Sequence, residues 1–136
     1  MLVTLKEALD HAEKHNYAVG MFGCYCEEMI RAIVEAGEES HSPVILGFGE
    51  GHIKYNKIHL EDISHLMINY AKRASIPVVV HLDHGFTYEN VVRAIHCDFS
   101  SVMIDASSAS YEENVRLCAE ISRIAHAVGC SVEAEI

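Results

Sequence analysis

Apolar and polar residues follow two different periods along this chain, and the two periods predict helices and strands in turn. Apolar residues at 63, 66, 67, 70 and 71 fall on one face of a helix. The apolar run 76–80 is instead typical of a strand that is buried on both faces, as in a parallel sheet. Repeated along the chain, these patterns predict helices at about 4–16, 27–39, 63–71, 88–95 and 110–128, and strands at 17–22, 43–48, 76–84, 101–105 and 130–136.

Several helix ends carry their own sequence signals. Thr4 with Glu7, and Ser110 with Glu113, have the spacing of a capping box at a helix N-terminus. Gly129 follows the last apolar stripe at the position of a helix C-cap. The stretch 47–57, rich in glycine and then in polar residues, is expected to be a flexible loop after the second strand.

The strict alternation of helix and strand predicts βαβ units and an α/β fold with a parallel sheet. No linker or change of composition divides residues 1–136, so we expect a single domain. Two architectures fit five parallel strands: a flavodoxin-like open sheet, and the first part of a (β/α)₈ TIM barrel, which needs ~250 residues. The chain stops on a strand without a covering helix, so we expect it to be truncated.

Ionisable residues gather where the last three strands are expected to end. His81, Asp83 and His84 come directly after the apolar run of the third strand. Gly85 follows at once, so the chain is expected to turn there, and Asp83 and His84 can face one crevice. Asp105 ends the fourth strand, and the fifth carries Glu133 and Glu135. The carboxyl ends of parallel strands meet at one edge of a sheet, and imidazole plus carboxylate is a zinc-type ligand set. The sequence therefore predicts a metal or substrate site.

Plainer interpretations remain open for some of these residues. Asp105 is as well explained by a turn or helix N-cap before Ser107 as by a metal. Glu133 is expected to be a solvated residue on the outside of its strand. The glycines of 47–52 do not make a dinucleotide-binding motif, because His52 takes the sixth position and no helix pattern opens there. A reactive thiol at Cys24 or Cys26 lacks a partner motif.

Composition narrows the class of protein. The formal net charge of −10 makes nucleic acid and anionic membrane poor partners. No apolar run approaches the ~20 residues of a membrane span, and the N-terminus lacks the pattern of a signal peptide. Five scattered cysteines, without a CxxC pair, are typical of a reduced, cytoplasmic protein.

Six short stretches, spread along nearly the whole chain, together resemble one protein family in their order and spacing. The sequence resembles the class II, zinc-dependent ketose-bisphosphate aldolases, a family that includes fructose- and tagatose-bisphosphate aldolases. The stretches that carry the resemblance are Tyr17–Gly20, Ser42–Gly47, His81–Gly85, Ser101–Ser107, Glu112–Val115 and Ser131–Glu135.

The resemblance implies a (β/α)₈ barrel, of which this chain is about the N-terminal half. It implies Asp83 as the catalytic acid/base, and His84, Glu135 and Asp105 as ligands or close neighbours of Zn²⁺. It implies that His81 does not bind the metal itself but supports the residues that do. Zinc would act as a Lewis acid on the ketone of a ketose 1,6-bisphosphate, which is cleaved reversibly to dihydroxyacetone phosphate and glyceraldehyde 3-phosphate. The family implies carbohydrate metabolism and a homo-oligomer, a dimer or tetramer.

Two loops depart from the family pattern. Relatives usually carry asparagines where this chain has Gly23–Cys26, and a serine where it has Gly49. Both loops border the expected site, so two alternatives stay open: another metal-dependent barrel lyase or hydrolase with an altered substrate, and a non-catalytic half-barrel. The isolated 136-residue chain is expected to be inactive, because the remaining metal ligands and the phosphate-binding loops of the family lie outside it.

Overall fold

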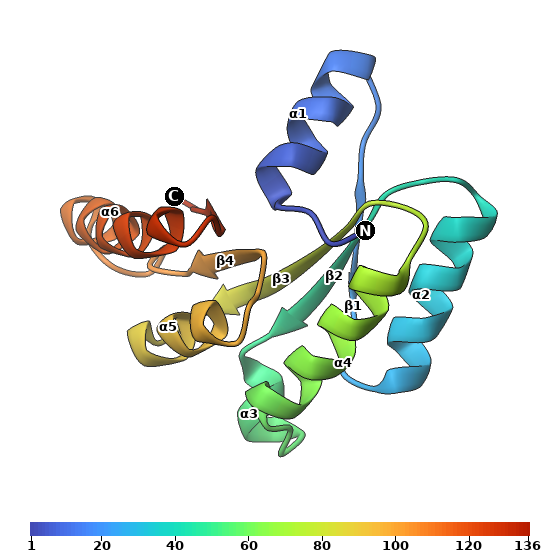
Figure 1. Cartoon of the computed structure of the whole chain (residues 1–136). Helices are drawn as coiled ribbons and strands as arrows, with labels where there is room; N and C mark the ends of the chain where they lie inside the picture. The colour runs from blue at the N-terminus through green and yellow to red at the C-terminus, as the bar shows by residue number, and fades with distance from the viewer.

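The computed structural model describes all 136 residues, and its strands form one five-stranded sheet (Figure 1). Neighbouring strands pair in parallel and stand in chain order, from first to last. A flavodoxin-like sheet places its second strand outside the first, so that alternative is wrong. The observed order is the one that a (β/α)₈ barrel requires. The strands are β1 (Gly20–Gly23), β2 (Val44–Gly49), β3 (Val78–Gly85), β4 (Ser101–Ile104) and β5 (Ser131–Glu133).

Four of the six helices pack in a row against the outer face of the sheet (Figure 1). Each of the four precedes the strand that it covers, and each packs beside the next one along the row. The first helix stands apart from the row, and one short helix follows β2. The helices are α1 (Leu5–His15), α2 (Glu27–Glu39), α3 (Gly51–Tyr55), α4 (Leu60–Arg73), α5 (Tyr88–His96) and α6 (Tyr111–Ala127).

The main core lies between this row of helices and the outer face of the sheet. Alternate residues of each strand point to this side, because side chains in a strand alternate between the two faces. Val80 and Leu82 of β3 are fully buried there, against helix residues such as Met67 and Val91. The apolar run that predicted β3 is therefore buried as expected.

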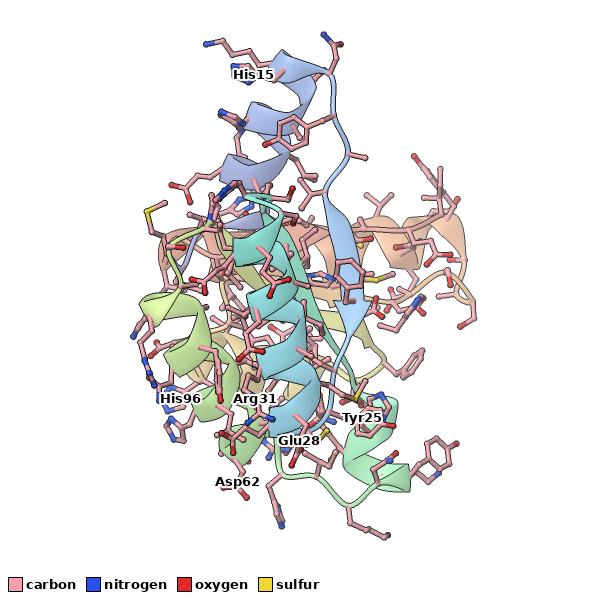
Figure 2. The ribbon with its side chains drawn as sticks, turned by 90° about the vertical axis from the view of Figure 1, so that its right-hand side faces the viewer. His15, Tyr25, Glu28, Arg31, Asp62 and His96 are labelled. Carbon is pink, nitrogen blue, oxygen red and sulfur yellow. The ribbon has the colours of Figure 1, made fainter.

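The other face of the sheet becomes polar toward the carboxyl ends of its strands. At the amino ends, Ile45 and Val79 form a small apolar cluster with Ala8 of α1. Helix α1 thus closes this end of the inner face, and Figure 2 shows His15 at its tip, with Tyr25 far away at the other end of the strands. Further along β3, the inner face carries His81 and then Asp83.

Two local predictions need correction. Residues expected to continue a flexible loop form α3, a helix of five residues. Its N-cap residue, Glu50, is held by hydrogen bonds to residues after β3, which the sequence pattern did not reveal. The capping box predicted at Ser110 is only half formed: Ser110 accepts from the Glu113 amide, while the Glu113 carboxylate pairs with Arg116 instead. The box at Thr4 and Glu7 is complete.

None of the helices combines the length and the apolar character that a membrane span requires.

Candidate functional site

The end of β3 is irregular, and the irregularity turns two ionisable side chains to the same side. Pairing with β4 shifts between Leu82 and Gly85. His84 has a left-handed backbone with φ of 48°, which non-glycine residues adopt only occasionally. As a result His84 Nε2 lies 3.9 Å from Asp83 Oδ1, although regular alternation would place them on opposite faces. Asp83 and His84 therefore lie side by side at the end of β3, as the turn expected at Gly85 would allow.

A glycine is required at position 85 because the surrounding atoms leave no room for a side chain. A Cβ atom at this position would lie 2.5 Å from both the carbonyl oxygen of Met103 and a methyl group of Val91. The backbone of β3 therefore approaches β4 and α5 closely where the turn begins, directly after His84.

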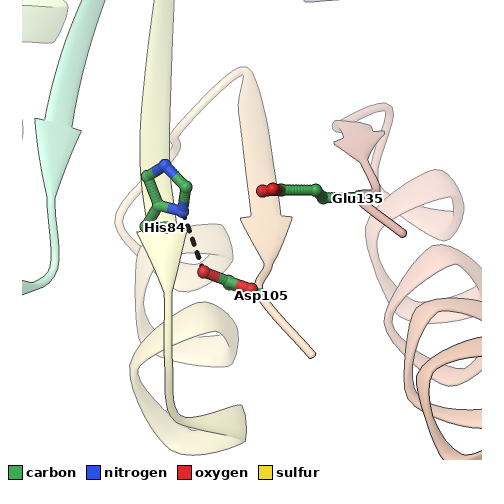
Figure 3. A group of neighbouring side chains, drawn as sticks. All are labelled: His84, Asp105 and Glu135. Carbon is green, nitrogen blue, oxygen red and sulfur yellow. Dashed lines mark hydrogen bonds and ion pairs between the residues drawn. The ribbon is translucent and has the colours of Figure 1, made fainter. Parts of the chain in front are cut away.

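Three predicted ligands come together at this edge of the sheet (Figure 3). His84 comes from β3, Asp105 from the residue after β4, and Glu135 from the segment after β5. One ligand atom from each of the three lies within 4.8 Å of those of the other two. The spacing of strand ends in the sequence therefore predicted a real cluster, which we call the strand-end cluster: His84, Asp105 and Glu135.

Asp105 closes a turn with one carboxylate oxygen and contacts His84 with the other. Its Oδ1 accepts hydrogen bonds from the Ser107 amide at 3.1 Å and hydroxyl at 2.7 Å, which closes a turn. Its Oδ2 lies 2.8 Å from His84 Nδ1. The bonds from Ser107, and then that from His84, hold the pKa of Asp105 below its usual value. In return, the hydrogen bond to Asp105 raises the pKa of His84.

Glu135 is held through its backbone. The side-chain amide of Asn114, a buried residue of α6, donates to the Glu135 carbonyl at 2.7 Å. The Cys118 thiol in turn lies 3.1 Å from Asn114 Oδ1, one helical turn further on. The carboxylate of Glu135 itself is free to face His84 and Asp105.

His81 is completely buried on the inner face of β3 and joins three strands. Its Nδ1 lies 2.9 Å from the Ser101 hydroxyl of β4. Its Nε2 lies 3.2 Å from a carboxylate oxygen of Glu133 on β5, without the alignment of a hydrogen bond. The proximity of His81 holds the pKa of Glu133 below its usual value. Glu133 therefore faces His81 and does not point outward as predicted, although 43% of its side-chain surface stays accessible to solvent.

Three residues that support the site were missed by the sequence analysis. They are Glu50, Ser101 and Asn114, all of them polar and buried. Glu50 follows the carboxyl end of β2, so the rule that located Asp105 could have found it. Ser101 begins β4 instead, and its contact with His81 depends on the pairing of β3 with β4. Asn114 lies within a helix, where one polar residue on a buried face gives no such signal.

Cys24, in the loop after β1, is not a reactive thiol. All five cysteines are free. Burial raises the pKa of Cys24 to about 12. A thiol with this pKa is not a nucleophile near neutral pH, which agrees with the absence of a partner motif.

The largest hollow of the molecule, about 600 Å³, lies elsewhere. It is lined by residues such as Leu2, Phe99 and Gly129 at the amino ends of the strands. Chemistry in α/β folds is placed at the carboxyl ends, where the strand-end cluster lies. The cluster, and not this hollow, is the candidate active site.

The strand-end cluster fits a divalent transition metal. One imidazole and two carboxylates are a nitrogen and oxygen donor set of the kind that catalytic zinc sites use. Bonds of about 2.0–2.2 Å place two ligands of one zinc ion roughly 3–4 Å apart. The atoms of the cluster spread to 4.8 Å, so a modest contraction would suffice, with the His84 to Asp105 hydrogen bond giving way.

Comparison with known proteins agrees with this geometry. The family model described as fructose-bisphosphate aldolase class-II matches residues 3–136. The chain belongs to the class II fructose-bisphosphate aldolase family. The predicted resemblance is thereby confirmed over nearly the whole chain.

Individual relatives are found among curated fructose-bisphosphate aldolases and among solved aldolase structures. The chain is 45% identical over 136 residues to a fructose-bisphosphate aldolase of Thermus caldophilus, and 44% identical over 138 residues to a probable one of Bacillus subtilis. The crystal structure of the YdjI aldolase from Escherichia coli K12 superposes on the whole chain with a TM-score of 0.93 at 37% identity.

The chain spans about half the length of these relatives. It covers 44% of the Thermus protein, 48% of the Bacillus protein and 52% of the Escherichia structure. The fold prediction is confirmed: five parallel strands alternate with helices, as in the N-terminal half of the family's (β/α)₈ barrel.

Proposed function

We propose that this chain provides the metal-binding and proton-transfer residues of an aldolase that cleaves a ketose 1,6-bisphosphate reversibly. The observation that carries the proposal is the strand-end cluster with Asp83 beside it. Family membership supports the same reaction class. Fructose-1,6-bisphosphate is the first candidate substrate, because several relatives are named fructose-bisphosphate aldolases. Tagatose-1,6-bisphosphate is the second.

In this proposal His84, Asp105 and Glu135 hold Zn²⁺. When bound, the metal supplies Lewis-acid polarisation of the substrate's ketone. The three side chains must present their donor atoms together, so His84 must lose its proton and its hydrogen bond to Asp105. Because the pKa of His84 is raised, a proton competes with the metal for this imidazole up to a higher pH than for an ordinary histidine.

Asp83 moves the proton. Its carboxylate lies next to His84, within reach of a substrate held at the cluster. In cleavage it would accept the proton of the hydroxyl that becomes the aldehyde, and in condensation it would return that proton. Its side chain is partly exposed, with 30% of its surface accessible, so a substrate could approach it.

His81 and Glu133 form a supporting layer below the cluster. The buried imidazole ties β3 to Ser101 of β4 and approaches Glu133 of β5. These contacts fix the spacing of the three strands whose ends carry the ligands. A homo-oligomeric assembly and a cytoplasmic location complete the proposal for the protein.

A coupled aldol-cleavage assay tests the function. It would use the longest reading frame that contains this sequence, with the 136-residue chain in parallel, and both ketose bisphosphates, with and without EDTA. EDTA-sensitive cleavage that is restored by Zn²⁺ is the expected result for the longer chain. Metal binding without cleavage of either sugar would contradict the proposed substrates, and cleavage that resists EDTA would contradict the metal.

A further inference from the structure

Glu50 is a buried carboxylate that lies outside the strand-end cluster. It follows β2 directly and is only 8% exposed. None of the ion pairs in the structure involves it. A buried carboxylate without a cation is costly unless hydrogen bonds satisfy it, so its partners explain why it is there.

Four donors surround this carboxylate, and all of them come from the segment after β3. Oε2 accepts from the backbone amides of Phe86 at 2.6 Å and Thr87 at 3.0 Å. Oε1 accepts from the Thr87 hydroxyl at 2.9 Å and from the side-chain amide of Asn90 at 2.8 Å. Thr87 is the N-cap of α5, so the negative charge also lies at the positive end of that helix.

The backbone of Glu50 adds a link on the other side of the turn. Its amide donates to the carbonyl of Asp83 at 3.3 Å. Glu50 therefore forms hydrogen bonds to residues before and after the short segment that contains His84 and Gly85. This segment has the shifted pairing and the left-handed His84 backbone, a conformation that persists only where the surroundings hold it.

We propose that Glu50 is a positioning residue, whose carboxylate clasps the segment after β3 and so fixes Asp83 and His84 relative to Asp105. The inference rests on the proposed function for the meaning of those three residues. The alignment of the metal ligands by Glu50 can nevertheless be measured without the reaction. Loss of a group that orients ligands lowers metal affinity by about 10–100-fold.

Two variants of Glu50 test the clasp in the 136-residue chain. Glu50→Ala leaves the four donors without an acceptor. Glu50→Gln keeps the shape of the side chain but replaces one acceptor oxygen with a donor and removes the charge. It therefore tests the clasp even if the alanine variant does not fold. Glu38→Gln is the matched control: the Glu38 carboxylate also accepts from a backbone amide and a hydroxyl, both of Ser75, just before β3 begins.

The first measurement is amide hydrogen exchange by NMR. We expect the Phe86 and Thr87 amides to exchange faster in Glu50→Gln and unchanged in Glu38→Gln. The second is the dissociation constant of Co²⁺, used as the probe metal. We expect it to rise on the order of tenfold in Glu50→Gln, with no change in Glu38→Gln.

Three outcomes would overturn the proposal. Protected Phe86 and Thr87 amides in Glu50→Gln would show that the clasp does not hold them. Faster exchange with unchanged Co²⁺ affinity would show that Glu50 serves the fold alone. An equal loss of affinity in the control would point to general destabilisation. None of these readouts needs catalysis, so the inference and the proposed function can fail separately. If Glu50 aligns the metal site but the protein cleaves no ketose bisphosphate, the proposed function is refuted and this inference stands.

Discussion

His84 Nδ1 lies 2.8 Å from Asp105 Oδ2, and this pair joins two neighbouring strand ends at the candidate site. The contact raises the pKa of His84 and helps to lower that of Asp105. When His84 is protonated, the two side chains therefore form an ion pair across the strand ends. Several measurable consequences follow from this arrangement.

Replacing Asp105 by asparagine should lower the pKa of His84. The variant removes the carboxylate that accepts from Nδ1, so the protonated imidazole loses its main partner. An NMR titration of the His84 ring protons measures the change. Asp10→Asn is the control, because Asp10 pairs only with Lys6 on the surface. An unchanged His84 titration in Asp105→Asn would contradict the contact.

The same pair predicts how the stability of the metal-free protein depends on pH. A raised pKa in the folded state means that the protonated form is favoured by folding, so this contribution is fully present below the usual His pKa of about 6.5. It is lost as the pH rises through the higher pKa of folded His84. Denaturant unfolding at several pH values should therefore show a smaller decline over this range in Asp105→Asn than in the original chain.

Asp83→Asn should separate catalysis from metal binding. The amide cannot take up the proton of the substrate hydroxyl, so the cleavage rate should fall by about 10²–10⁴-fold. Metal affinity should hardly change, because Asp83 is not one of the three clustered ligands. The coupled assay and a Co²⁺ titration of the longest reading frame measure the two effects. Full activity in Asp83→Asn would remove it from the mechanism.

Gly85→Ala should destabilise the fold at the end of β3. Its methyl group would meet Met103 and Val91 at 2.5 Å, and such overpacking costs about 1–3 kcal/mol. Gly23→Ala is a matched control, because a Cβ atom there meets nothing within 4 Å. Chemical denaturation of both variants measures the difference. Equal midpoints for the two variants would contradict the close approach at Gly85.

Cys24 should resist alkylation in the native protein. Burial raises the pKa of its thiol to about 12, and the side chain is not accessible. Iodoacetamide at pH 8, followed by peptide mass spectrometry, should leave Cys24 unmodified until denaturant is added. Rapid native labelling of Cys24 would instead indicate an open loop after β1.

Hydrophobic periodicity determined most of the fold in advance. Apolar runs on β3 and β4 are buried as predicted, and α2 spans the predicted residues 27–39. Helix α3 escaped prediction because five residues are too few to show a helical period. Its place is instead fixed by the contacts of Glu50 with residues more than thirty positions away.

The site was predictable wherever its residues end strands. His84, Asp105 and Glu135 meet because parallel strands bring their carboxyl ends to one edge. The orientation of Glu133 was missed because it depends on the register of β5 against β4, which pairs it with Met103 and turns it toward buried His81. Register of this kind is set by tertiary pairing and not by the local sequence.

Paramagnetic NMR of the 136-residue chain with Mn²⁺ tests the central claim most directly, because it locates even a weakly bound ion residue by residue. We predict that broadening centres on the amides of His84, Asp105 and Glu135, and that Zn²⁺ reverses it. The variant His84→Ala should abolish this pattern. Broadening centred elsewhere, or an unchanged pattern in His84→Ala, would contradict the strand-end cluster as the metal site.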